Sequence, residues 1–210
     1  TIFGNKPSEY FNGYGSVDVS IPAYTAMIIA TTGLTGLTIT MSSYREQGIL
    51  RRLRTTPISP LYILIAQLVV LFLMTTLGMI MLVIAAKFIY NMRFDGNVLS
   101  VLGGFTLSSL SFFAIGFILA GLMPTARTAM IVAMALLYPM LFLCGAGYPL
   151  ELLPESIHKI NKFLPLTYVV KLLRGLWIGE SWSLHATEAL VLVGIMLVGV
   201  LISVKTFRWE

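Results

Sequence analysis

The chain has 210 residues, a formal net charge of +5 and only 11% charged residues, against 57% hydrophobic ones. A soluble domain has roughly a quarter charged residues, so this composition excludes a soluble globular protein, and its hydrophobicity excludes a disordered one. A basic excess is typical of Lys and Arg at membrane boundaries, so it does not indicate a nucleic-acid partner.

Charge-free stretches cover more than half of the chain: 19–44, 55–86, 96–126, 128–150 and 189–204. A bilayer-spanning helix needs about 20 predominantly apolar residues. The sequence therefore predicts an all-α polytopic membrane protein, organised as a single domain over residues 1–210.

We expect residues 1–20, which are polar and rich in Gly, Ser and Asn, to form an outer loop. The first span is predicted at Ile21–Ser43, where Pro22 fits the first turn because the N–H that it lacks would be unpaired there anyway. Four more spans are predicted, at Leu61–Ala86, Val98–Met123, Thr128–Gly147 and Ala186–Val204.

The segment 44–56 carries four arginines within ten residues, which favours the cytoplasmic side. With five spans, Thr1 then lies outside, and an earlier span is needed to carry it there. We therefore expect the full chain to have six spans, with the N-terminal helix lying before Thr1.

The region 148–183 contains three prolines and two short runs of apolar residues at helical spacing: Ile157, Ile160, Phe163 and Leu164, then Val169, Leu172, Leu173 and Leu176. Each run is too short to cross a bilayer. Because backbone within a membrane must satisfy its own hydrogen bonds, two short re-entrant or interfacial helices on the outer side fit this region.

Several kinds of chemistry find no support in the sequence. There is no G-x-x-x-x-G-K-[ST] loop for ATP, and two histidines with one cysteine offer no credible zinc set. The spans hold almost no ionisable residue, and Glu188 reads as interfacial. We therefore expect no catalytic residue, metal or cofactor in this chain, and we expect any energy for transport to come from another chain.

The segment 44–56 could receive that energy. On a helix, Ile49, Leu50 and Leu53 fall on one side, and Pro57 ends the helix. Such a helix lies on the membrane surface, either as an anchor for anionic lipid or as a site on which a cytoplasmic protein acts. Glu46 favours the second interpretation, because an acid beside four arginines adds nothing to a lipid anchor.

Two blocks of sequence resemble those of a known family. Arg45-Glu46-Gln47-Gly48, followed by Leu53, Thr56-Pro57 and Ser59, resembles the R-E-x-G…L-x-x-T-P-x-S segment of ABC-2-type permeases, the membrane subunits of ATP-binding-cassette exporters. A second block, from Gly145 to Gly175, looks like the family's G-x-x-x-P…P…P-L-T-Y…L-R stretch. The size of the chain is similar to that of the daunorubicin-resistance type.

The resemblance implies a permease subunit of an ATP-driven exporter in a bacterial or archaeal plasma membrane, with a hydrophobic cargo such as a drug, an antibiotic or a lipid. It also implies a second permease subunit, as in a homodimer, two copies of an ATPase subunit that binds ATP and Mg²⁺, and contact with membrane lipid. The residues implied for coupling to the ATPase are Arg45, Glu46, Gly48, Leu50, Leu53 and Pro57. Those implied for the outer re-entrant motif are Gly147, Pro149, Pro154, Pro165, Thr167, Tyr168 and Arg174.

Other functions remain open from the residues alone. A channel or scaffold that works without an ATPase would show the same spans. A membrane-embedded enzyme acting on lipid would need paired polar or metal-binding residues at one depth, and none is visible. The residues that bind cargo are unknown.

Overall fold

A computed structural model describes residues 14–49, 60–144, 161 and 163–206. Its elements are all helical: α1 (Ser16–Ala30), η2 (Thr31–Leu37), α2 (Thr38–Glu46), α4 (Pro60–Tyr90), α5 (Val98–Leu122), α6 (Ala126–Leu143), α8 (Pro165–Trp177) and α9 (Ala186–Thr206). Among the described residues, five helices are long and apolar enough to cross a membrane, with α1, η2 and α2 forming one of them. The predicted all-α polytopic membrane fold is confirmed.

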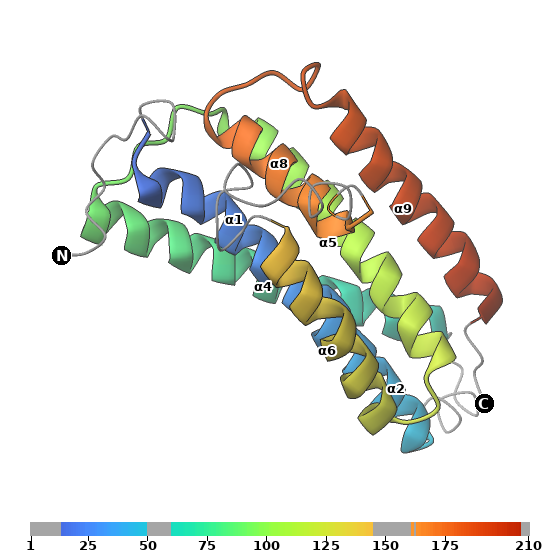
Figure 1. Cartoon of the computed structure of the whole chain (residues 1–210). Coiled ribbons are helices and arrows are strands. Elements are labelled where there is room, and N and C mark those ends of the chain that lie inside the picture. Colours follow the sequence, from blue (N-terminus) through green and yellow to red (C-terminus); the bar gives the residue numbers. More distant parts are fainter. Residues whose placement is uncertain (1–13, 50–59, 145–160, 162, 207–210) are drawn as a thin grey trace.

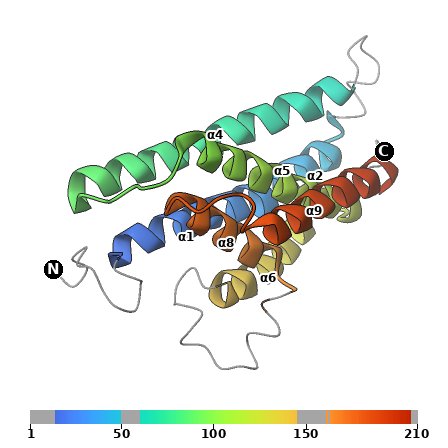
Figure 2. The same ribbon diagram turned by 90° about the horizontal axis from the view of Figure 1, so that it is seen from above.

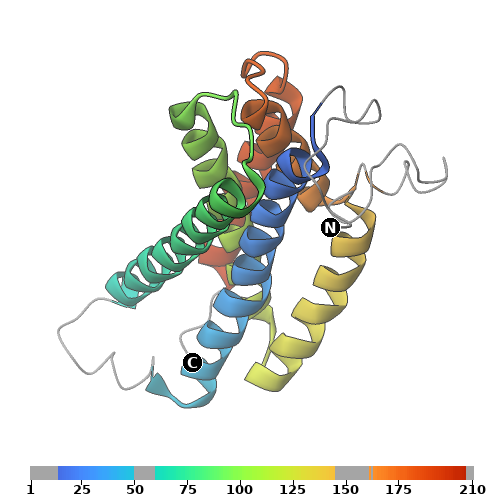
Figure 3. The same cartoon turned by 90° about the vertical axis from the view of Figure 1, so that its left-hand side faces the viewer.

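The helices form a bundle in which successive spans run in opposite directions (Figure 1). The continuous helix α1–η2–α2 runs between α4 and α6 (Figure 3), and it packs against both as well as against α5. Helix α9 lies along α5, while α4 occupies one flank of the bundle (Figure 2). Much of the side-chain surface of α4 and α9 is exposed and apolar, as expected of surface that faces lipid or a neighbouring subunit.

Most predicted boundaries agree closely with the structure, but the first one is wrong. The predicted outer loop 1–20 overlaps α1, which begins at Ser16. The side chain of Asp18 accepts a hydrogen bond from the backbone N–H of Gly15 at 3.1 Å, and this cap starts the helix upstream of the apolar run. Consequently Pro22 lies inside the helix rather than in its first turn.

The middle of the first span is a π-helix, η2, flanked by α-helix on both sides. Its sequence is rich in Thr and Gly, and the Thr35 hydroxyl donates to the carbonyl of Thr31 at 2.5 Å. A Cβ added to Gly33 would lie 2.8 Å from the Cβ of Phe112 in α5. Gly33 is therefore the point at which the span approaches α5 most tightly, since any side chain would push the two helices apart.

Small residues of α5 and α6 lie at close contacts within the chain. Gly116 of α5 packs directly against the backbone of Gly33, and the Thr38 hydroxyl donates to the Gly116 carbonyl at 3.1 Å. On α6, Ala129 and Ala133 are fully buried. Small residues let helix backbones approach closely in a membrane protein, and here they join α5 and α6 to the first span.

Candidate coupling site

The bundle has two ends, which lie at opposite ends of the long helices in Figure 1. The polar contacts at these two ends differ. We call the end where α2 and α5 finish and α6 begins the Glu46 end. The opposite end, where α1 begins and the loop between α4 and α5 lies, is the Asp18 end. The predicted coupling residues that the structure describes, Arg45, Glu46 and Gly48, belong to the first end, and the described part of the outer block belongs to the second.

At the Glu46 end, two charged side chains of α2 reach the turn between α5 and α6. Arg45 donates from a guanidinium nitrogen to the carbonyl oxygen of Gly121 at 3.1 Å. The Glu46 carboxylate accepts a hydrogen bond from the backbone N–H of Ala126 at 2.8 Å. Arg45 and Glu46 thus connect the final turn of α2 to α5 and α6, through backbone groups that are about eighty positions away in sequence.

Each of these charges matches the helix end that it contacts. Gly121 lies in the last turn of α5 and Ala126 is the first residue of α6. The carbonyls at a helix C-terminus carry partial negative charge and the N–H groups at an N-terminus partial positive charge, and neither set has a partner within the helix. Arg45 and Glu46 therefore each satisfy an otherwise unpaired backbone group of favourable sign.

The segment predicted as a separate helix over 44–56 begins differently from the expectation. Tyr44, Arg45 and Glu46 are the last turn of α2, and Gln47 and Gly48 form a turn. Gly48 has φ of +67°, a backbone conformation that favours glycine. The coupling residues Leu50, Leu53 and Pro57 lie outside the described residues, so the helix expected there remains a prediction.

At the Asp18 end, a buried carboxylate joins two segments. Asp18 is 2% exposed, and besides capping Gly15 it accepts a hydrogen bond from the backbone N–H of Arg93 at 3.0 Å. Arg93 belongs to the loop between α4 and α5. The start of the first span is thereby tied to that loop by a charge shielded from solvent, which strengthens each of its hydrogen bonds.

The same loop packs against the end of α8. A Cβ on Gly96 would overlap the carbonyl oxygen of Leu176, and the ring of Phe94 meets that of Trp177 edge-on, with centroids 4.9 Å apart. Gly179 follows α8 with φ of +87° and lies against the Asp95 carbonyl. These contacts hold the end of α8 against the loop that leads into α5.

Helix α8 is the described part of the predicted outer block. Pro165 is at its start, and Thr167, Tyr168 and Arg174 follow along it. The four apolar residues predicted to share one face of this helix are all buried: Val169, Leu172, Leu173 and Leu176. Their burial is against α1 and α5 of the bundle. Gly147, Pro149 and Pro154 lie outside the described residues, as do Ile157 and Ile160 of the first predicted short helix. Of its other two residues, Phe163 is in a turn and Leu164 is the N-cap of α8.

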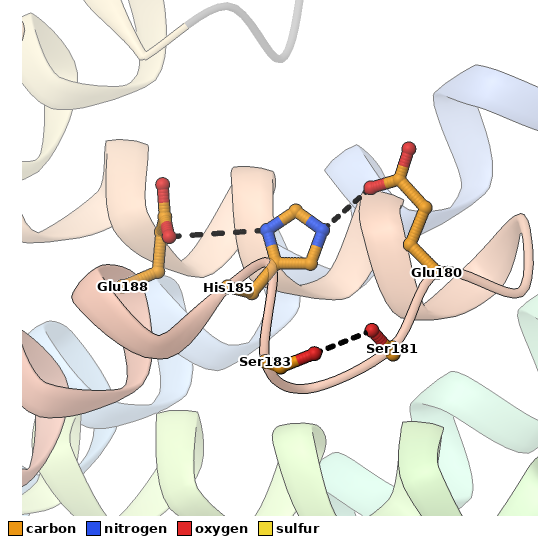
Figure 4. Close-up of polar contacts among 5 residues, drawn as sticks. All are labelled: Glu180, Ser181, Ser183, His185 and Glu188. Carbon is orange, nitrogen blue, oxygen red and sulfur yellow. Dashed lines mark hydrogen bonds and ion pairs between the residues drawn. The ribbon is translucent and has the colours of Figure 1, made fainter.

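A second polar cluster lies between α8 and α9 (Figure 4). A ring nitrogen of His185, Nε2, is 2.6 Å from the carboxylate of Glu180, and its other nitrogen, Nδ1, is 3.8 Å from that of Glu188. The ring lies over Gly175 of α8, where a Cβ would overlap it. Glu188 stands in the first turn of α9, and its interfacial place remains a prediction.

The described spans carry Asp, Glu, Lys and Arg only in their terminal turns. Within the described part of the chain, no three of the side chains of His, Cys, Asp and Glu are arranged to hold a metal ion. Among the described residues, the arrangement offers charged groups that bind backbone at both ends of the bundle, and spans whose middle turns carry no Asp, Glu, Lys or Arg.

Sequence reasoning missed Asp18 and the cluster at His185. The signal for Asp18 was its position three residues after Gly15, which is the spacing of a helix cap. The partners of Arg45 and Glu46 are backbone groups, and a sequence carries no mark of which distant backbone group a side chain will contact.

Comparisons with known proteins support the resemblance. A profile of the ABC-2 type transporter family matches residues 1–177, up to the end of α8. The chain is 26% identical over 215 aligned positions to "Putative transport permease ycf38" of Porphyra purpurea, covering 98% of the chain and 72% of that protein. It is 31% identical over 74 residues to "Nodulation protein J" of Rhizobium leguminosarum bv. viciae, covering 35% of the chain and 29% of that protein.

Two further nodulation proteins J show similar short matches, from Rhizobium leguminosarum bv. trifolii and Bradyrhizobium diazoefficiens, at 29% identity each. The matches span about a third of the length of the nodulation proteins. No solved structure gives a significant match. The family profile covers well over half of the residues, and the chain therefore belongs to the ABC-2 type transporter family.

Proposed function

We propose that this chain is the permease subunit of an ATP-driven ABC exporter that moves hydrophobic cargo, such as a drug, an antibiotic or a lipid, across the membrane. The family match over residues 1–177 carries the transport role. ATP hydrolysis, export and the class of cargo belong to the proposal, as do assembly with two ATPase subunits and a second permease subunit, which would make a homodimer.

The distribution of charge supports an external energy source. Proton- and ion-driven carriers need ionisable groups within the membrane, whereas the described spans hold Asp, Glu, Lys and Arg only in their terminal turns. Residues 44–56 begin in the last turn of the first span and carry the motif that resembles a coupling segment. In the proposal, the ATPase acts on this segment and the permease converts the movement into a change of access for the cargo.

The test is ATP-dependent transport in a reconstituted system. The permease is co-expressed with a Walker-motif ATPase sought among the neighbouring reading frames. Inside-out vesicles are then incubated separately with ethidium, daunorubicin and a fluorescent phospholipid as probes. We expect ATP-dependent accumulation or flipping of at least one probe, and no such activity when the Walker-motif lysine of the ATPase is replaced by alanine.

An ATPase-independent channel or scaffold is the alternative function. A channel would let a probe equilibrate without ATP and without the ATPase subunit. If the ATPase fails to co-purify with the permease and no probe moves with ATP, the export proposal is wrong, and the channel or scaffold takes its place.

A further inference from the structure

We propose that Arg45 and Glu46 form an internal tether, which binds the end of α2 to the turn between α5 and α6 and passes movement of the segment after Gly48 on to these two helices. The inference rests on the proposed function, because it assumes that an ATPase acts on that segment. It assigns Arg45 and Glu46 a positioning role inside the permease in place of direct contact with the partner.

The contacts of the two side chains support this assignment. The carboxylate of Glu46 is 2.8 Å from the Ala126 nitrogen, and the guanidinium of Arg45 is 3.1 Å from the Gly121 oxygen. Both are charge-assisted hydrogen bonds, which are stronger than neutral ones. A side chain that already satisfies a backbone group of its own chain is less available for a socket on another protein, which is the role that the sequence favoured for Glu46.

The position of the tether suits transmission. Gly48 has φ of +67° and stands in the turn that follows α2. A force applied beyond this turn reaches the bundle at Glu46 and Arg45 first. Without the tether, the last turn of α2 could fray, because an exposed helix end has few contacts to hold it.

Contacts of α2 with α5 and α6 beyond the tether allow a movement of α2 to be transmitted to these two helices. Helix α2 lies along α6 and contacts α5, and its Thr38 hydroxyl donates to the Gly116 carbonyl of α5. Met41 is buried with Phe113 and Phe117 of α5. The tether therefore closes the open end of an interface that is already packed, and we expect α2, α5 and α6 to move together with the tether intact.

The first experiment asks whether the tether exists. Hydrogen exchange is measured by mass spectrometry on the full chain in nanodiscs, for peptides that contain the Ala126 amide. In Glu46→Ala this amide loses its acceptor, and we expect it to exchange about twofold to fivefold faster. Gln47→Ala is the matched control, since Gln47 is the next residue, is also exposed, and donates to Ser43 of its own helix.

The second experiment asks whether the tether transmits movement. In the complex with the ATPase, we expect Glu46→Ala to lower ATP-dependent movement of the active probe and permease-stimulated ATP hydrolysis about threefold to tenfold. Glu46→Gln keeps an acceptor oxygen and should fall between Glu46→Ala and the unaltered chain. Co-purification of the ATPase should stay unchanged in both variants, since the tether lies within the permease.

Cross-linking separates a fixed tether from one that must open. Glu46→Cys and Ala126→Cys are combined with Cys144→Ala, and the two thiols are joined by a short bis-maleimide. We expect the cross-link to restore coupled ATP hydrolysis and transport towards the unaltered level. Treatment with N-ethylmaleimide, or cross-linker on either single cysteine, should restore nothing.

The outcomes distinguish this inference from the proposed function. Normal transport and exchange in Glu46→Ala, at matched expression, would overturn the tether. Loss of ATPase co-purification in Glu46→Ala would instead place Glu46 in a socket on the ATPase, and loss of transport on cross-linking would show a contact that must break. Failure of the unaltered chain to couple with its ATPase would overturn both the proposed function and the transmitting role, while hydrogen exchange would still decide whether the tether forms.

Discussion

The two ends of the bundle are held together in different ways. At the Asp18 end, a carboxylate that is 2% exposed accepts hydrogen bonds from backbone of two segments, and glycines let the loop and α8 meet backbone to backbone. At the Glu46 end, an exposed carboxylate and a partly exposed guanidinium contact the ends of α5 and α6. Buried polar contacts are costly to break and exposed ones are not. We therefore expect the Asp18 end to stay fixed and the Glu46 end to adjust.

Thermal unfolding can measure this difference in stability, because the chain carries a natural probe of unfolding. Its single cysteine, Cys144, is fully buried, and a thiol-reactive dye labels it only as the structure opens. The following variants compare the two ends by this measurement on purified protein in detergent, from the largest expected change to the smallest.

The largest effect should come from Asp18→Ala. This variant leaves the buried N–H of Gly15 and the part-buried N–H of Arg93 without the carboxylate. We expect it to cost about 2–4 kcal/mol, since a stranded buried group costs about 1–3 kcal/mol and the loss of the second hydrogen bond adds to that. Asp18→Asn, which keeps one acceptor oxygen, should lose less. A midpoint of dye labelling equal to that of the unaltered chain would mean that Asp18 does not hold the two segments together.

Gly96→Ala should be the next most damaging change. The added methyl would overlap the backbone oxygen of Leu176, which cannot rotate away as a side chain can, and overpacking of this kind typically costs about 1–3 kcal/mol. Gly194→Ala is the matched control, because nothing lies within 4 Å of a Cβ at Gly194. Equal midpoints for the two variants would contradict the tight contact between the loop and α8.

Glu46→Ala should shift the midpoint little. An exposed carboxylate at a helix N-terminus contributes about 0.3–1 kcal/mol, and salt screens that contribution. The difference between Glu46→Ala and the unaltered chain should therefore shrink when the salt concentration is raised, whereas the effect of Asp18→Ala should persist. A loss as large as that of Asp18→Ala would make the two ends alike and remove the basis of the comparison.

Gly175→Ala should have the smallest effect on stability. The added methyl meets the ring of His185, and that ring can rotate towards solvent because its partner Glu180 is 43% exposed. Surface ion pairs contribute about 0–1 kcal/mol, so we expect a cost of about 0.5 kcal/mol or less. A cost comparable to that of Gly96→Ala would show that the cluster at His185 is a fixed support of α8.

The spans were predictable because each is a long charge-free stretch bounded by charge or proline. The face of α8 was predictable as well, since Val169, Leu172, Leu173 and Leu176 recur at helical spacing and are all buried. The start of α1 was not, because Ser16–Ser20 is polar and its helix depends on a cap by Asp18. A hydropathy pattern detects apolar runs. It does not detect a hydrogen bond by which a helix begins upstream of such a run.

The candidate site was predicted only in part. The motif placed Arg45 and Glu46 in a separate surface helix over 44–56 next to the first span, whereas the structure has them in the last turn of α2. Their contacts with Gly121 and Ala126 could not be predicted, because those contacts depend on how α2 packs against α5 and α6 and involve backbone groups that every residue type shares. The π-helix was also beyond prediction, since its composition suits an ordinary α-helix within a membrane.

The π-helix sets the rotational phase of the first span. A π turn winds less per residue than an α turn, so the residues after Leu37 face a different direction from the one that uninterrupted α winding would give them. The Asp18 half of the span can therefore face α8 while its Glu46 half faces α6. Replacing the π winding of Thr31–Leu37 by α winding at unchanged length would turn one half of the span against the other by roughly 100°. Arg45 and Glu46 would then point away from the turn that they contact, although neither residue had been changed.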